Sequence, residues 1–188
     1  MVLVASVVTA GANAQGADDC TAPQFILGTG PHAFDTSAAT TDGVADPVCS
    51  SAGSDQIFDD VWFRWTAIED GPHVLSLCTG SATGNPRVAV YDGSCAGSLI
   101  ACNDDACGLR SELSFYAVNG NRYAVRIGNF AEGGATIGDF TVTLVPPMEN
   151  PNNGHFYQLF DEGLSWTDAR ALAENLIWQG IPGHLVTI

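Results

Sequence analysis

Six short runs in which apolar and polar residues alternate restrict this chain to a fold built from β-strands. The runs occupy residues 61–66, 73–77, 87–91, 112–118, 122–127 and 140–145. In the first run Val61, Phe63 and Trp65 share one face, and a period of two is typical of a strand with one buried face. Turn pairs such as Asp92-Gly93 lie between the runs and supply the left-handed residues of tight hairpins. Because no helical pattern intervenes, the sequence predicts a mainly β fold over residues 15–146, an antiparallel β-sandwich of the jelly-roll kind.

A different pattern begins after a stretch rich in proline. Residues 147–153 read PMENPNN, and because proline lacks the donor that a sheet requires, they predict a linker. In residues 154–188 the period becomes helical, with Ser165 and Asp168 at the positions of a capping box and Gly180 and Pro182 expected to end the helix. The apolar stripe of this helix comprises Trp166, Ala169, Leu172, Ala173, Leu176 and Ile177. With a short strand expected at 184–188, this part predicts a small α+β unit.

The first fourteen residues are typical of a signal peptide. They form an apolar run that is too short to span a bilayer and that ends in small residues, Ala12-Asn13-Ala14. Cleavage is expected before Gln15, and a buried N-terminal strand is the alternative. No later stretch has the 18 or more apolar residues that a membrane span needs, so we expect a secreted protein without a span.

The cysteines also indicate an oxidising compartment. There are six, an even number, at positions 20, 49, 78, 95, 102 and 107. Three disulfides would account for all of them, although six cysteines allow 15 different sets of pairs and the sequence leaves the choice open. Zinc is the competing interpretation, which the absence of a C-x-x-C motif disfavours.

The charge balance excludes one class of partner. The chain carries 21 acidic side chains against 6 basic ones, all of them arginine, for a net charge of -15. Nucleic acids and anionic membranes are bound mainly by cationic side chains, so neither is an expected partner.

One acidic loop is a candidate calcium site. Asn103, Asp104 and Asp105 lie between two cysteines, Cys102 and Cys107, and Asp92 precedes a glycine turn nearby in the sequence. Calcium prefers oxygen ligands and takes six to eight of them, so these four residues are its candidate ligands. The alternative is an acidic turn in which the side chains bind their own backbone.

Trp62 is the candidate for ligand binding through an exposed ring. It points to the face opposite Val61, Phe63 and Trp65, where a sugar could stack on it. The alternative is that Trp62 is buried beneath a loop or in a second core layer, since tryptophan is usually well buried.

No motif in the chain indicates catalysis. The four histidines, at positions 32, 73, 155 and 184, are scattered, and neither G-x-S-x-G nor H-E-x-x-H occurs. The sequence therefore predicts a protein that is not an enzyme.

Residues 18–146 resemble the bacterial pre-peptidase C-terminal type of β-sandwich. The resemblance is carried by six motifs: Ala17-Asp18-Asp19-Cys20, the stretch from Asp35-Thr36 to Thr41-Asp42-Gly43, Asp60-Val61-Trp62-Phe63-Arg64-Trp65, Val90-Tyr91-Asp92-Gly93-Ser94-Cys95, residues 101–108 (ACNDDACG), and Tyr123-Ala124-Val125-Arg126-Ile127-Gly128. It implies a secreted, non-catalytic appendage of exported bacterial proteins.

Residues 154–188 are similar to the opening of a C-type lectin domain. The similarity is carried by Gly154-His155-Phe156-Tyr157, by residues 164–174 (LSWTDARALAE) and by residues 183–188 (GHLVTI). It implies the first strand, first helix and second strand of that domain, with Ala173 in the place of the family's helix cysteine. The family's calcium and sugar ligands would lie beyond Ile188, so this segment represents an incomplete lectin domain.

Together these patterns predict a secreted, non-catalytic recognition or adhesion module. Its expected partner is a glycan or a cell-surface or extracellular protein, bound through the lectin-type domain of a longer parent protein. The alternative is an accessory domain of an exported hydrolase or protease whose catalytic domain lies outside this chain.

Overall fold

The computed structural model describes residues 16–157, 165–175, 177–178 and 181–186. The predicted signal peptide, residues 1–14, lies outside the described residues. The chain divides into two compact units on either side of the Val145–Pro146 bond, and each unit is described by itself.

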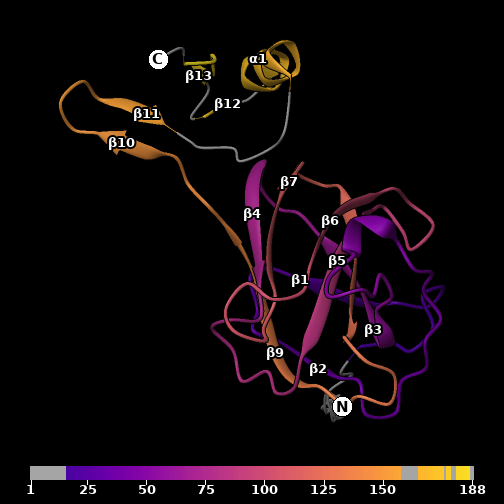
Figure 1. Cartoon of the computed structure of the whole chain (residues 1–188). Helices are drawn as coiled ribbons and strands as arrows, with labels where there is room; N and C mark the ends of the chain where they lie inside the picture. The colour runs from indigo at the N-terminus through magenta and orange to yellow at the C-terminus, as the bar shows by residue number, and fades with distance from the viewer. Residues whose placement is uncertain (1–15, 158–164, 176, 179–180, 187–188) are drawn as a thin grey trace, which may run out of the picture. The chain divides into compact units, whose positions relative to one another are not determined.

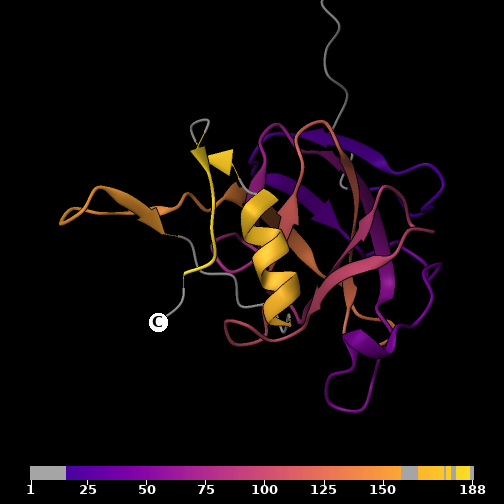
Figure 2. The same ribbon diagram turned by 90° about the horizontal axis from the view of Figure 1, so that it is seen from above.

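The first unit is a β-sandwich. Its strands are β1 (Gln24–Leu27), β2 (His32–Asp35), β3 (Phe58–Thr66), β4 (Gly71–Ser76), β5 (Pro86–Asp92), β6 (Leu99–Asn103), β7 (Glu112–Ala117), β8 (Arg122–Asn129) and β9 (Ile137–Leu144), with one short 3-10 helix, η1 (Pro47–Cys49). A five-stranded sheet has the order β1-β3-β8-β5-β6, and a four-stranded sheet has the order β2-β9-β4-β7. Figures 1 and 2 show these two sheets facing each other.

Strands β2 to β9 have the connectivity of a jelly roll. Four of them form one sheet in the order β2-β9-β4-β7, and the other four form the second sheet in the order β3-β8-β5-β6. All pairs among these eight strands are antiparallel. The predicted fold class is therefore confirmed. One pair departs from it, because β1 adds to the edge of β3 in parallel, with Phe25 opposite Arg64.

All six alternating runs lie in strands except for the last residue of three of them, Leu77, Val118 and Val145, and their apolar faces meet between the sheets. Phe63 and Trp65 of β3 pack with Phe115 of β7 and Phe140 of β9, and each of these side chains is at most 2% exposed. Trp65 meets Phe115 edge to face, with 6.0 Å between the ring centres. Burial of these large apolar surfaces supplies the main favourable free energy of folding.

The three predicted disulfides are present. They join Cys20 to Cys95, Cys49 to Cys102 and Cys78 to Cys107. No cysteine is free. Such a set of bonds is typical of proteins that fold in an oxidising compartment. Among the helices that the structure describes, none is long and apolar enough to cross a membrane.

The second unit begins with a hairpin rather than with a linker. Strands β10 (Met148–Asn150) and β11 (His155–Tyr157) form an antiparallel pair, so β10 occupies residues 148–150 of the predicted linker at 147–153. Pro147 and Pro151 flank β10 instead of interrupting it, and Gly154 closes the turn with a positive φ of 67°.

Helix α1 (Trp166–Asn175) begins where the capping pattern predicts. The hydroxyl of Ser165 accepts a hydrogen bond from the backbone N–H of Asp168 at 3.2 Å. The helix is shorter than predicted, because Ile177 already pairs in β12 (Ile177–Trp178) with β13 (Ile181–Pro182). The strand expected at 184–188 is absent over residues 184–186, and its last two residues lie outside the described part of the chain.

Candidate ligand-binding site

The outer face of the five-stranded sheet carries polar side chains and is partly covered. Residues 40–57, called the covering segment, lie over it and accept hydrogen bonds from Trp62, Arg87 and Arg126. The chain at Ala17 pairs with Trp62 at the edge of β3. A second apolar cluster forms beneath this cover and includes Ile57, Trp62, Ala89 and Tyr91. Two of the disulfides, Cys20–Cys95 and Cys49–Cys102, attach the cover to the loop after β5 and to β6. The sandwich therefore has a third layer on this side.

Trp62 is buried in this third layer and does not offer a ring to a ligand. Its side chain is 1% exposed. Its indole N–H donates to Asp42 at 2.7 Å and to Asp60 at 3.0 Å, and its ring lies 5.7 Å from that of Tyr91. The expectation of an exposed binding ring is wrong, because the covering segment shields the face to which Trp62 points.

Two buried arginines hold the covering segment down. The Arg126 guanidinium donates to the carbonyl oxygens of Val44 and Ile57, each at 2.8 Å, and pairs with Asp60. Gly43 is required at this point, because a Cβ on it would overlap the guanidinium of Arg126.

Arg87 also fixes the covering segment, because it donates to the carbonyl oxygens of Ser51, Ser54 and Gln56 at 2.9 to 3.1 Å. It also pairs with Asp104 at 3.0 Å. Both arginines are at most 1% exposed, and each is paired with a carboxylate inside the protein.

The buried position of Asp60 changes its proton affinity. Desolvation raises the pKa of Asp60 to about 6, more than the Arg126 guanidinium lowers it, and the neighbouring Asp42 carboxyl adds to the rise.

The four candidate calcium ligands do not form one cluster. Asp104 is 6% exposed, and one of its oxygens binds Arg87. The side-chain oxygen of Asn103 accepts from the backbone of Glu112 at 3.2 Å. Asp105 is exposed, and Asp92 lies at the end of β5. Ligand atoms of a metal-binding group should lie within 4.8 Å of one another. Among the described residues, the carboxylates of Asp92, Asp104 and Asp105 do not form such a group.

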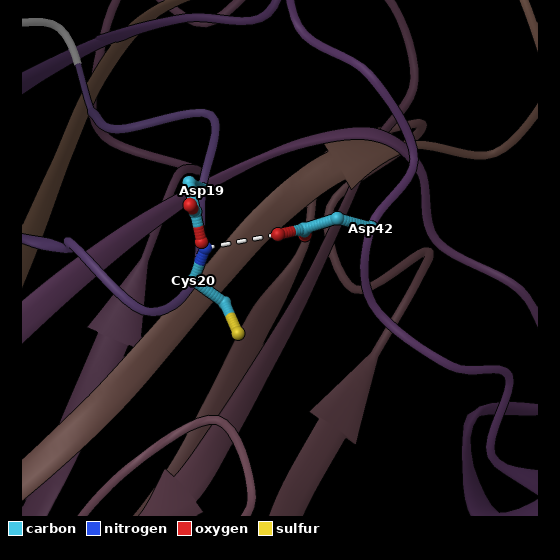
Figure 3. Close-up of side chains that lie close together, drawn as sticks. All are labelled: Asp19, Cys20 and Asp42. Carbon is cyan, nitrogen blue, oxygen red and sulfur yellow. Dashed lines mark hydrogen bonds between the residues drawn. The ribbon is translucent and has the colours of Figure 1, made fainter.

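Asp19, Cys20 and Asp42 do come within 4.8 Å of one another (Figure 3). The Cys20 sulfur is bonded to Cys95, and the Cys20 N–H donates to Asp42 at 2.9 Å. Asp19 accepts from the backbone N–H and the hydroxyl of Thr21, at 2.7 and 2.8 Å, which lowers the pKa of the Asp19 carboxyl. These contacts explain why the three residues lie together: they attach the N-terminal part of the chain to the covering segment.

A polar depression of about 600 Å³ lies on the sandwich. It is lined by Arg64, Asp92, Gly93, Ser94, Gly120, Asn121 and Arg122. Arg64 lies opposite Ala124 on the neighbouring strand β8, so Arg64 and Arg122 project from the same face of the sheet. The volume of the depression is in the range of ligand pockets, about 300–1,000 Å³, but the depression is lined by polar residues, whereas such pockets are mostly apolar.

The two arginines of this depression have no anionic partner among the described residues. Arg87 and Arg126 form buried ion pairs, and Arg170 pairs with Glu174. Arg110 donates to the carbonyl oxygens of Cys78 and Gly80. In the part of the chain that the structure describes, Arg64, Arg110 and Arg122 therefore lack a carboxylate partner. Arg110 is held by carbonyl oxygens, whereas the buried Nε of Arg64 has no acceptor.

An exposed aromatic ring lies beside Arg64, outside the lining of the depression. The guanidinium carbon of Arg64 lies 5.4 Å from the centre of the Phe25 ring, and Phe25 is 66% exposed. A planar cation beside an aromatic face is a favourable arrangement that also holds the cation in place.

Of the residues that line this depression, only Asp92 was a candidate from the sequence. The alternation that placed Trp62 on the outer face places Arg64 there too, and arginine is scarce in this chain, so those two facts could have directed attention to Arg64. Arg122 and Phe25 could not be added without the pairing of β1, β3 and β8.

The fold and its bonds define a disulfide-bonded jelly-roll sandwich. No protein-family model, curated protein or solved structure matches this chain.

Proposed function

We propose that this chain belongs to a secreted, non-catalytic recognition module and that the depression beside Arg64 and Arg122 is where its sandwich binds saccharides. The observation that carries the proposal is the pair of guanidinium groups without an anionic partner among the described residues, next to an exposed aromatic ring. Secretion is supported by the three disulfides and by the apolar, small-residue pattern of residues 1–14.

The chemistry of the lining suits a sugar. Arg64, Asn121 and Arg122 offer several N–H donors, and the Asp92 carboxylate accepts hydrogen bonds from hydroxyl groups. The Phe25 ring offers an apolar surface to the C–H face of a pyranose. An open polar surface beside one ring matches a ligand that is polar at its edges and apolar on its faces.

The histidines of the sandwich support a role other than catalysis. His73 is 3% exposed and hydrogen-bonded to the carbonyl oxygen of Gly71, and the ring of His32 contacts the carbonyl oxygen of Gly28. Both rings also pack against core aromatics, His73 on Trp65 and His32 on Phe140. The proposal assigns no role to calcium, because the carboxylates expected to bind it do not converge.

Affinity electrophoresis of the full chain tests the proposal. The chain is run through gels that contain neutral or acidic polysaccharides, and at least one polysaccharide is expected to retard it. Changing Arg64 and Arg122 together to Gln should abolish the retardation, whereas Arg170→Gln, which removes one positive charge from an exposed position outside the sandwich, should not. Equal retardation of all three proteins would show that the sugar binds elsewhere.

A further inference from the structure

We propose that the saccharide bound in the depression carries a carboxylate, and that Arg64 and Arg122 recognise it. This inference rests on the proposed function, which it narrows to uronate-containing glycans. The juxtaposition that supports it is two guanidinium groups, one carboxylate and two amide or hydroxyl side chains around a single depression.

The charge inventory makes the arginine pair unusual. In a chain of net charge -15, an arginine at the surface has many acidic side chains available to neutralise it. The four other arginines each bind acceptors within the chain, and two of them are buried in doing so. Arg64 and Arg122 are separated by one residue pair of the β3–β8 ladder, and neither meets a carboxylate within 4.0 Å in the described structure. An arginine pair of this kind suits an anion supplied from outside.

The form of the two cations favours a carboxylate. A guanidinium group presents paired N–H donors that match the two oxygens of a carboxylate, and such hydrogen bonds are about twice as strong as neutral ones. The Arg64 side chain is half-buried and lies against Phe25, so it loses less conformational freedom on binding than a mobile surface arginine.

Asp92 distinguishes a uronate from a small inorganic anion. Its carboxylate lines the same depression and would repel phosphate or sulfate placed between the arginines. A uronate ring has both a carboxylate for the arginines and hydroxyl groups for Asp92, so it satisfies both signs of charge at once.

The net charge of the protein argues against densely sulfated glycans. Charges further than about 8 Å are largely screened at physiological ionic strength, so one carboxylate in the depression interacts mainly with the two arginines. A densely sulfated chain carries more charges per sugar than a uronate chain, and the acidic remainder of the surface would repel the charges outside the depression more strongly.

Isothermal titration calorimetry of the full chain tests this inference. The probes are oligosaccharides of galacturonate, glucuronate and mannuronate, each with its methyl ester as the matched neutral ligand. At least one acid is expected to bind at least about tenfold more tightly than its ester. Arg122→Gln should weaken that binding roughly tenfold and Arg64→Gln at least as much, while Arg170→Gln should leave it unchanged. Arg122 is exposed, so its replacement keeps the test informative if Arg64→Gln lowers stability.

The outcomes separate this inference from the proposed function. Two results would leave the saccharide site in place but refute recognition of a carboxylate. One is equal binding of an acid and its ester, and the other is binding of neutral oligosaccharides while all three acids fail to bind. Binding of inorganic phosphate as tight as that of the uronates would also overturn it. If no saccharide, acidic or neutral, binds in a manner that Arg122→Gln weakens, the proposed function itself is wrong.

Discussion

Replacement of Arg126 by methionine should destabilise the sandwich by about 4 kcal/mol. Methionine keeps the unbranched stem of arginine out to the position of Nε, but it lacks the guanidinium group and cannot donate a hydrogen bond. It would leave the Asp60 carboxylate, which is 0% exposed, without its ion-pair partner. It would also remove the donors that hold the carbonyl oxygens of Val44 and Ile57. Removal of one partner of a buried ion pair costs about 3–5 kcal/mol, which sets the magnitude.

Urea unfolding followed by tryptophan fluorescence measures this change. Trp62 and Trp65 are each 1% exposed, so their signal reports on the cluster beneath the covering segment and on the core between the sheets. With a slope of about 2 kcal/mol per molar urea, a loss of about 4 kcal/mol lowers the midpoint by roughly 2 M. The loss should be smaller at about pH 5 than at about pH 8, because without Arg126 the pKa of Asp60 rises further above 6 and the acid becomes neutral.

Arg126→Met combined with Asp60→Leu is the matched control. Replacing both members of a buried pair by apolar groups is often close to neutral, so the double variant should be more stable than Arg126→Met alone. The reasoning fails if Arg126→Met unfolds at the wild-type midpoint. It also fails if the double variant is no more stable than the single one, because the destabilisation would then arise from lost packing and not from the unpaired charge.

The other predictions concern pH and disulfides. Because the folded-state pKa of Asp60, about 6, lies above its ordinary value of 3.8, folding gains stability from protonation below about pH 4 and loses it as the pH rises through about 6, by about 3 kcal/mol in total. The unfolding free energy of the wild type should fall between about pH 4 and pH 6, and that of Asp60→Asn should not. If the variant shows the same fall, another group causes the pH dependence. Replacing Cys20 and Cys95 by alanine opens a loop with a sequence separation of 75, which should cost about 4.5 kcal/mol by the chain-entropy relation. It should also weaken saccharide binding, because Ser94 lines the depression next to Cys95; unchanged affinity in calorimetry would show that the disulfide does not position that loop.

The six core strands were predictable because alternation is a local property that records which face of a strand is buried. The strands that the sequence analysis missed, β1, β2 and β6, are four or five residues long and show no clear alternation. Their positions depend on pairing with distant strands, as β1 pairs with β3 across more than thirty residues. Strand β10 was missed for a different reason, because the prolines at 147 and 151 indicated a linker, whereas β11 lies where the resemblance to a lectin domain implied a first strand.

The amino-acid sequence by itself determined the class of fold, the number of disulfides and the orientation of Trp62 and Arg64 away from the core. These properties follow from composition and from a period of two, which neighbouring residues express without reference to the rest of the chain. Only the tertiary structure decided that the covering segment lies over Trp62 and leaves Arg64 uncovered, and which cysteine meets which. Those outcomes depend on contacts between residues tens of positions apart, and no local pattern encodes which of two outward-facing side chains another segment will cover.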